Sequence, residues 1–443
     1  MPKKILLINP WIYDFAAFDL WLKPLGLLYL SAMLKQKGFS VSLIDVMDRQ
    51  HPSMQDFSMK NKKFGTGKFY SESIEKPNIL KFVPRSYYQF GMPKKVFIKN
   101  LQNRDKPDVI LVTSMMTYWY RGVAATIDII KTLFPNVPVV LGGIYAFLMP
   151  EHAKKNTKAD FVCKSNKPSE IGNLLNNILK VNVDFHKFDS FANWPAPDFS
   201  YYPNSKYAVL TTSLGCVYKC SYCASPVLYP VFYRKLPKIV FQEIFDFIQK
   251  FSITDLAFYD DALFIYKEKY FIPMIKKILK AKLNLNFHTP NGLHAKMIDE
   301  KLAVLLYEAQ FKTLRLSLET NDEYLQKKTG GKVTNKEYER AIHSLQQAGY
   351  KQKDLKTYIL VGMPNQNKQQ IIDTIHYVKD LGATPSLAEY SIIPGTKDWL
   401  KYNDLYDLEN LDPLLHNNSV FSVYMNFISF EELQEFKFLA KIN

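Results

Sequence analysis

The sequence predicts an α/β protein of two domains, each built on a parallel sheet. The chain has 443 residues, which is more than one ordinary domain contains. Short apolar runs alternate with segments of helical periodicity, and such alternation is typical of parallel sheets. We therefore expect a doubly wound parallel sheet in residues 1–180, a proline-containing linker in 181–206, a partial (β/α)6 barrel in 207–400 and a short helical tail in 401–443.

The first domain contains five apolar runs that are short enough to be buried strands. They are residues 4–9, 40–44, 109–113, 139–141 and 161–163. The helices expected between them are residues 25–36, 122–133 and 170–179. The segment 47–107 lacks clear periodicity and is too long for a plain connection, so we expect an inserted substructure or a lid there.

The second domain repeats the alternation six times. Its expected strands are residues 208–212, 255–259, 284–288, 313–318, 356–361 and 386–392. Helices are expected between them, for example over residues 238–251, 265–281 and 335–348. Six units are fewer than the eight of a closed barrel, and the active sites of such barrels lie at the carboxyl ends of the strands.

The net charge of +15 has two interpretations. Lysines spread along the chain indicate a solvated surface, whereas a local patch would indicate an acidic partner. Residues 60–63 and 94–99 are the densest basic stretches. The short tail offers no recognisable RNA-binding module, so we expect no nucleic-acid partner.

The N-terminus lacks the apolar core of a signal peptide. The chain also has no run of about 18 uncharged apolar residues, the length that a membrane-spanning helix needs. We therefore expect a cytoplasmic protein without a membrane span.

Three of the four cysteines lie within eight residues, as Cys216, Cys220 and Cys223. This C-x3-C-x2-C spacing directly follows the first strand of the second domain, and it is not a disulfide framework. Three thiolates can hold three irons of a cubane cluster and leave the fourth iron open. A zinc site would need a fourth Cys or His nearby, and Cys163 is too distant in sequence, so we expect it to pack as a small hydrophobic residue.

The cysteine motif in this position resembles that of the radical S-adenosylmethionine (SAM) superfamily. The resemblance implies a [4Fe–4S] cluster on the three catalytic cysteines, with SAM bound at the open iron. It also implies an external electron donor of the flavodoxin or ferredoxin kind. Tyr222, just before Cys223, matches the aromatic residue that packs near the adenine of SAM.

Polar residues follow the second, third and fourth strands of the expected barrel. They are Asp260, Asp261, Asn291 and Glu319. The resemblance places such strand-end residues near SAM, and Glu319 matches the glutamate that faces it. The alternatives are a helix-capping pair for the two aspartates and an ordinary exposed carboxylate for Glu319. His288 and His294 are either proton donors or substrate contacts, or satisfied structural histidines.

Open parallel sheets bind ligands beyond the carboxyl ends of their strands. In the first domain, Ser114 and Trp119 follow the third strand, and Gly142 and Gly143 follow the fourth. Paired glycines let the backbone approach a ligand closely.

These loops resemble the cobalamin-binding domain that precedes many radical SAM barrels, although the Asp-x-His-x-x-Gly motif is absent. The resemblance implies that Ser114, Gly142 and Gly143 border the corrin. Trp119 either covers its lower face or is a core aromatic. The alternative for the whole domain is a fold that binds no corrinoid.

The two resemblances together imply a cobalamin-dependent radical SAM enzyme. The expected reaction is C-methylation of an unactivated carbon in a small molecule or peptide, by way of a 5′-deoxyadenosyl radical. The alternative is a rearrangement, cyclisation or oxidation, with cobalamin as an electron relay or absent. A tRNA methylthiotransferase would need a second three-cysteine site, and only Cys163 remains.

Overall fold

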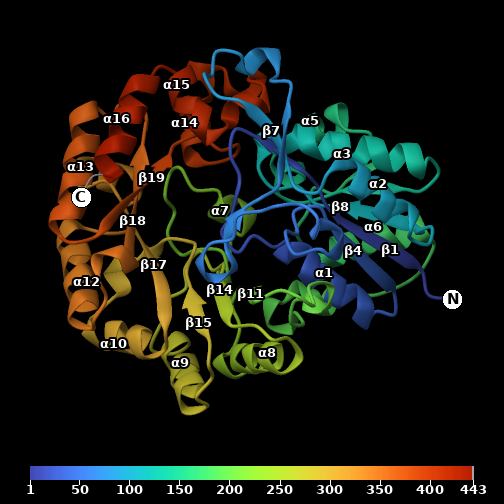
Figure 1. The fold of residues 1–443 in the computed structure, drawn as a ribbon, viewed down its shortest axis with the longest axis horizontal. Coiled ribbons are helices and arrows are strands. Elements are labelled where there is room, and N and C mark those ends of the chain that lie inside the picture. The colour runs from blue at the N-terminus through green and yellow to red at the C-terminus, as the bar shows by residue number, and fades with distance from the viewer. Residues whose placement is uncertain (442–443) are drawn as a thin grey trace. The chain divides into compact units, whose positions relative to one another are not determined.

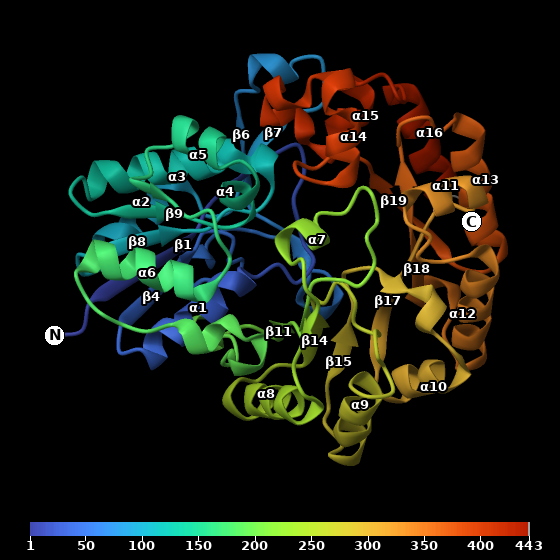
Figure 2. The same cartoon turned by 180° about the vertical axis from the view of Figure 1, so that it is seen from behind.

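The computed structural model describes residues 1–441, which form two compact units. The division falls between Ala208 and Val209. Each unit is built on its own parallel sheet, and Figures 1 and 2 show helices on the faces of both sheets. The α/β class that the sequence predicts is therefore confirmed.

Unit 1 has a five-stranded sheet in the order β10-β9-β8-β1-β4. Its strands are β1 (Lys4–Asn9), β4 (Ser40–Asp45), β8 (Val109–Val112), β9 (Val139–Leu141) and β10 (Phe161–Val162). All four pairings are parallel. The chain moves outward from β1 in both directions, so the topological switch point lies between β1 and β8, where doubly wound sheets bind ligands.

Six helices belong to unit 1. They are α1 (Leu25–Gln36), α2 (Lys94–Gln102), α3 (Tyr120–Leu133), α4 (Ile144–Leu148), α5 (Pro150–Asn156) and α6 (Pro168–Leu179). On α3, Val123, Ile127 and Ile130 are spaced four and three residues apart and are buried in the core with β8 and β9. This apolar stripe explains why the segment folds as a helix against the sheet.

The segment 47–107 contains regular structure. It holds β5 (Gly67–Lys68), β6 (Ser71–Ile74), β7 (Tyr87–Phe90) and α2. Strand β7 pairs antiparallel with β6 and with β2 (Ile12–Asp14), and β5 pairs with β3 (Phe18–Asp19). The buried Arg49 guanidinium donates to Asp19 Oδ2 at 3.2 Å and to three backbone carbonyls, which ties this segment to the start of the chain.

Unit 2 is built on the strand order β11-β14-β15-β17-β18-β19. These strands are β11 (Tyr207–Leu210), β14 (Asp255–Phe258), β15 (Asn286–His288), β17 (Phe311–Glu319), β18 (Leu355–Val361) and β19 (Thr384–Glu389), and the short β16 (Leu293–His294) pairs with β17. Within residues 1–441 no pairing joins β19 to β11, so the barrel is partial and open. This agrees with the six-unit prediction.

A separate hairpin of β12 (Ser213–Leu214) and β13 (Tyr233–Arg234) follows β11. The helices of unit 2 are α7 (Ser225–Leu228), α8 (Pro237–Lys250), α9 (Phe271–Lys280), α10 (Glu300–Glu308), α11 (Glu323–Thr329), α12 (Asn335–Gln347), α13 (Lys368–Asp380), α14 (Lys397–Tyr406), α15 (Asn418–Tyr424) and α16 (Phe430–Lys441).

The expected helix over 265–281 is wrong at its start, because α9 begins only at Phe271. Tyr266 has a left-handed φ of 53°, which ends the preceding turn instead of continuing it into a helix.

The described part of the chain contains no helix that is both long enough and apolar enough to cross a bilayer.

Candidate active site

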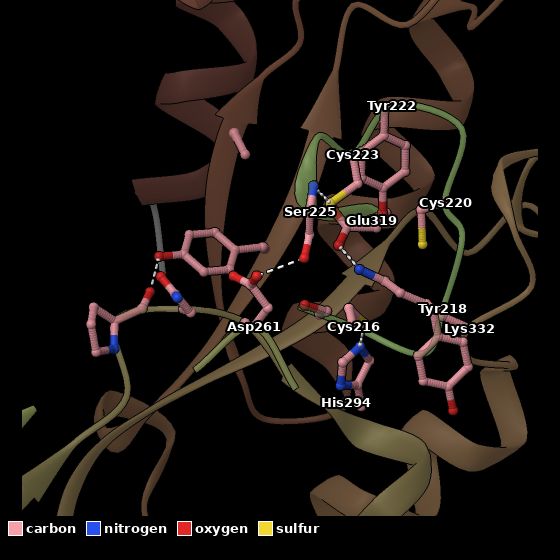
Figure 3. Close-up of a pocket in the computed structure, with 16 residues that line it drawn as sticks. Cys216, Tyr218, Cys220, Tyr222, Cys223, Ser225, Asp261, His294, Glu319 and Lys332 are labelled. Atoms are coloured by element: carbon pink, nitrogen blue, oxygen red, sulfur yellow. Dashed lines mark hydrogen bonds and ion pairs between the residues drawn. The ribbon is translucent and has the colours of Figure 1, made fainter. Parts of the chain in front are cut away.

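The three motif cysteines border one cavity of about 340 Å³ in unit 2 (Figure 3). Cys216 and Cys223 are partly exposed, Cys220 is buried, and all three are free thiols. The cavity also receives Asp261, Asn291 and Glu319, which follow three different strands. The structure thus brings together residues that are separated by about a hundred positions in sequence.

Asp260, which the sequence groups with these site residues, does not border the cavity. The residue is 4% exposed, and its carboxylate accepts hydrogen bonds from the Thr212 backbone N–H at 2.9 Å and from the Thr212 hydroxyl at 2.6 Å. It also accepts one from the Ser213 hydroxyl at 2.5 Å. Asp260 therefore anchors the start of the loop that carries the cysteines.

Asp261 and Cys223 are joined through Ser225. The Ser225 hydroxyl donates to Asp261 Oδ2 at 2.6 Å, and the Ser225 backbone N–H donates to Cys223 Sγ at 3.4 Å. Asn291 holds the ends of two strands together, because its amide donates to the Tyr259 carbonyl at 3.0 Å.

The chemistry of the three thiols fits an iron–sulfur cluster. Burial raises the pKa of Cys216 and of Cys220, and it raises that of Cys223 to about 11. Buried thiols of this kind ionise when cations are bound to their sulfurs, so metal binding and thiolate formation are coupled here. Three ligands on one short loop suit three corners of a cubane.

Lys332 is a site residue that the sequence analysis missed. Its ammonium donates to Glu319 Oε1 at 2.5 Å, and the two side chains are 13% and 11% exposed (Figure 3). Burial lowers the pKa of Lys332, but the charges of Glu319 and Cys220 outweigh this effect and hold the pKa above its usual value. The cavity wall therefore carries a carboxylate beside an ammonium.

The backbone around this ion pair is unusual. Glu319 ends β17 with a left-handed φ of 70°, a strained conformation that is common at functional sites. Lys332 follows two glycines, and a Cβ added at Gly330 would lie 2.9 Å from Cys220 Cα. The glycine pair just before a lysine, in the loop between α11 and α12, was the available signal for this residue.

An adjacent carboxylate and ammonium fit the amino-acid part of SAM, whose own ammonium and carboxylate have the complementary charges. Tyr222 borders the same cavity and packs against a buried core that contains Leu325 and Trp399. The ammonium of Lys332 lies 5.7 Å from the centre of the Tyr222 ring. These residues therefore fit SAM beside a cluster.

The structure separates the two ambiguous histidines. His288 is fully buried, with Nε2 2.8 Å from Asp255 Oδ1 and Nδ1 2.9 Å from Thr313 Oγ1, so it is a satisfied structural histidine. His294 borders the cavity, with Nε2 3.9 Å from Cys216 Sγ. Burial lowers the pKa of His294 to about 3, so the ring is neutral at physiological pH.

In unit 1, Ser114 follows β8, Gly142 and Gly143 follow β9, and hydrogen bonds join these two segments. The Ser114 hydroxyl donates to the Gly142 carbonyl at 2.6 Å and accepts from the Ala146 N–H at 3.3 Å. Gly143 has φ 89°, and an added Cβ would lie 2.2 Å from the Ser114 carbonyl oxygen. Met116 and Ile144, on the two flanking segments, are both exposed.

Trp119 lies at the end of a 3₁₀ turn, Thr117–Trp119. Its indole N–H donates to Asp14 Oδ2 at 2.7 Å, and its ring packs on a cluster that includes Ile12 and Met47.

Cys163 belongs to unit 1 and donates its S–H to the Ser165 carbonyl at 3.4 Å. It is not among the residues that border the cavity.

The comparisons with protein families identify both units. The radical SAM superfamily matches residues 210–378, and the B12 binding domain family matches residues 87–170. No curated protein has a sequence that matches this chain.

Several solved structures resemble this chain over most of its length. The methyltransferase TsrM from Kitasatospora setae, with tryptophan substrate and a SAM analogue bound, has a TM-score of 0.66 at 16% identity over 91% of this chain and 76% of that one. The structure of TsrM from the same organism with cobalamin and a [4Fe–4S] cluster bound has a TM-score of 0.65 at 17% identity, over 91% of this chain and 75% of that one. The structure of the cobalamin-dependent SAM radical enzyme OxsB has a TM-score of 0.61 at 14% identity, over 92% of this chain and 56% of that one. At these identities the likeness shows a shared fold.

A chain that carries a B12-binding domain followed by a radical SAM domain is a radical SAM enzyme of the cobalamin-dependent kind. These two domain families confirm the predicted family and the predicted cofactors, a [4Fe–4S] cluster, SAM and cobalamin.

Proposed function

We propose that this protein is a C-methyltransferase that acts on an unactivated carbon of a small molecule or peptide. The observation that carries the proposal is the joining of two domains in one chain. One is a B12-binding domain, and the other holds three cysteines and a Glu319–Lys332 pair around a single cavity. Bound SAM and cluster supply a hydrogen-abstracting 5′-deoxyadenosyl radical, and bound cobalamin supplies a methyl carrier.

The residues of the cavity have complementary roles in this proposal. Cys216, Cys220 and Cys223 would ligate three irons of a [4Fe–4S] cluster, whose fourth iron would be open to SAM. Glu319 accepts hydrogen bonds from the SAM ammonium, while Lys332 donates to the SAM carboxylate. These two residues would hold both polar ends of the amino-acid part of SAM on one wall of the cavity.

Other residues act by positioning. Asp261 fixes Ser225, whose backbone N–H orients Cys223, and Asp260 fixes the backbone where the loop begins. In unit 1, the segment of Gly142 and Gly143 would border the corrin; Gly143 packs so closely on the Ser114 backbone that an added Cβ would lie 2.2 Å from the Ser114 carbonyl oxygen.

The proposal is tested with protein reconstituted anaerobically with iron, sulfide and hydroxocobalamin. It is incubated with a reductant, a fractionated metabolite or peptide mixture and SAM that carries a deuterated methyl group. We expect a product with one deuterated methyl group. We also expect equal amounts of S-adenosylhomocysteine and 5′-deoxyadenosine, because one SAM donates the methyl group and a second takes the substrate hydrogen.

A Cys216→Ala variant is expected to form neither product, whereas the matched Cys163→Ser variant keeps the cluster absorbance and the activity. Formation of 5′-deoxyadenosine and a changed substrate without methyl gain would instead support the rearrangement, cyclisation or oxidation alternative. A protein that retains no stoichiometric corrinoid would contradict the methyltransferase proposal.

A further inference from the structure

His294 is an imidazole beside the cysteine loop, and the proposed function gives it no role. Its Nε2 lies 3.9 Å from Cys216 Sγ, and the residue is 6% exposed (Figure 3). Among residues 1–441, this sulfur is the one hydrogen-bond partner of the ring. A buried imidazole whose partner is the sulfur of a cluster ligand is placed to act on the cluster itself.

The fold holds this imidazole from two sides. Its strand β16 pairs in parallel with β17, so that His294 lies opposite Ser317. A Cβ added at Gly292 would lie 2.0 Å from Ser317 Oγ, so glycine is needed for the chain to approach β17 this closely. The Tyr218 ring lies against the imidazole, with ring centres 4.8 Å apart and planes 30° from parallel. The orientation of Nε2 toward Cys216 is therefore fixed by the backbone and by a neighbouring ring.

The Cys216 sulfur acts only as an acceptor once it is bound to iron. A thiolate ligand carries no proton, so the hydrogen of this contact lies on Nε2 of His294. The Tyr218 backbone N–H donates to the same sulfur, and the Ser225 backbone N–H donates to Cys223 Sγ at 3.4 Å. Backbone donors of this kind are present whatever the side chain is. His294 differs from them because it is a side-chain donor that a substitution can remove.

A hydrogen bond to a ligand sulfur acts on the charge of the cluster. The reduced cluster carries one more electron than the oxidised cluster, and part of that charge lies on the sulfurs. A donor therefore stabilises the reduced state more than the oxidised state, which raises the reduction potential. The low exposure of His294 strengthens this effect, because little water screens the contact.

We propose that His294 tunes the cluster through a hydrogen bond from its Nε2–H to Cys216 Sγ. The bond raises the potential at which [4Fe–4S]²⁺ takes one electron from an external reductant and becomes [4Fe–4S]⁺. His294 is thus a positioning residue that acts through Cys216, without touching the substrate or exchanging a proton. The proposal depends on the cluster alone, so it holds for methyl transfer and for the alternative reactions alike.

The test compares the reconstituted full chain with two variants of this residue. His294→Leu removes the donor, whereas His294→Gln supplies an amide N–H in its place. His343→Leu, at an exposed histidine of α12, is the matched control. Iron is measured per chain, and the midpoint potential of the cluster is measured without SAM by a redox titration that is followed by electron paramagnetic resonance.

We expect the equilibrium constant for one-electron reduction to fall about tenfold in His294→Leu, which lowers the midpoint potential by about 59 mV. His294→Gln should recover most of this shift, and His343→Leu should have the wild-type potential. A wild-type potential in His294→Leu, or an equal shift in His343→Leu, would overturn the proposal. Methyl transfer that fails in a wild type with the higher potential would instead contradict the proposed function alone.

A second measurement applies even where His294→Leu assembles no cluster. The wild type is produced with isotopically labelled histidine nitrogen, its cluster is reduced, and pulsed electron paramagnetic resonance records the coupling of that nitrogen. We expect the weak coupling of an N–H that donates to a ligand sulfur, and we expect it to be lost in His294→Gln. No coupling, or the strong coupling of a nitrogen bound to iron, would overturn the proposal.

Discussion

Replacing Lys332 by methionine removes the ammonium beside Glu319 and keeps a side chain of similar length. In our account Lys332 holds the carboxylate of SAM. A hydrogen bond to a charged group contributes about 1.5–3 kcal/mol, so the Kd of SAM should rise about 10- to 150-fold. Isothermal titration of SAM into the anaerobic holoenzyme measures this effect, and the cluster absorbance should remain unchanged.

The same substitution leaves Glu319 buried without its partner. Breaking a buried ion pair from one side costs about 3–5 kcal/mol, and the slight exposure of both side chains favours the lower end of that range. The double variant Glu319→Gln/Lys332→Met should recover most of this stability but none of the SAM affinity. The exposed Lys336→Met serves as the control and should change neither quantity. Wild-type SAM affinity in Lys332→Met would refute the assigned role.

Three further predictions concern other parts of the chain. Asp260→Ala removes the acceptor of three hydrogen bonds at the cysteine loop, so chemical analysis should find less bound iron per chain. Chemical denaturation should show that the free energy of unfolding falls by about 2–4 kcal/mol. Unchanged iron content would contradict the anchoring role of Asp260. Gly143→Val forces a Cβ onto the Ser114 carbonyl oxygen, so corrinoid content should fall while cluster absorbance stays at the wild-type level, and equal loss of both would show a general folding defect instead. Burial raises the pKa of Asp45 to about 6 from about 3.9 in an unfolded chain, so the folded state holds the proton longer and stability falls as pH rises, by about 2 kcal/mol between pH 4 and pH 6. Asp45→Asn should flatten that part of the urea-unfolding profile, and an unaltered slope would argue against the buried carboxyl as its source.

The strands of the two main parallel sheets could be predicted from the sequence because each is a short apolar run, whereas the short polar strands β5 and β6 in segment 47–107 could not. For example, the run expected at residues 4–9 is β1 (Lys4–Asn9), and the run at 139–141 is β9. The start of α9 was wrong because residues 265–270 contain no glycine or proline to mark a break, while the left-handed φ of Tyr266 is a property of the folded backbone. Periodicity alone does not reveal such a turn.

The site was predicted in part for a related physical reason. Asp260 and Asp261 are neighbours, so their side chains leave the strand end in different directions, and only Asp261 reaches the cavity. Lys332 was missed because its partner Glu319 lies 13 residues earlier, across α11, and no local spacing rule links the two. The roles of Ser114 and Trp119 at a corrin stay predictions, since both are engaged here in hydrogen bonds within unit 1.

The central claim is that one chain binds a [4Fe–4S] cluster and a corrinoid together. It is tested most directly by absorption and electron paramagnetic resonance spectra of the anaerobically reconstituted protein, with iron, sulfide and cobalt measured per chain. We predict one cluster and one corrinoid per chain, with the cluster lost in Cys216→Ala and retained in Cys163→Ser. A reconstituted chain that lacks either cofactor, or a cluster that survives the loss of Cys216 but not of Cys163, would contradict the account.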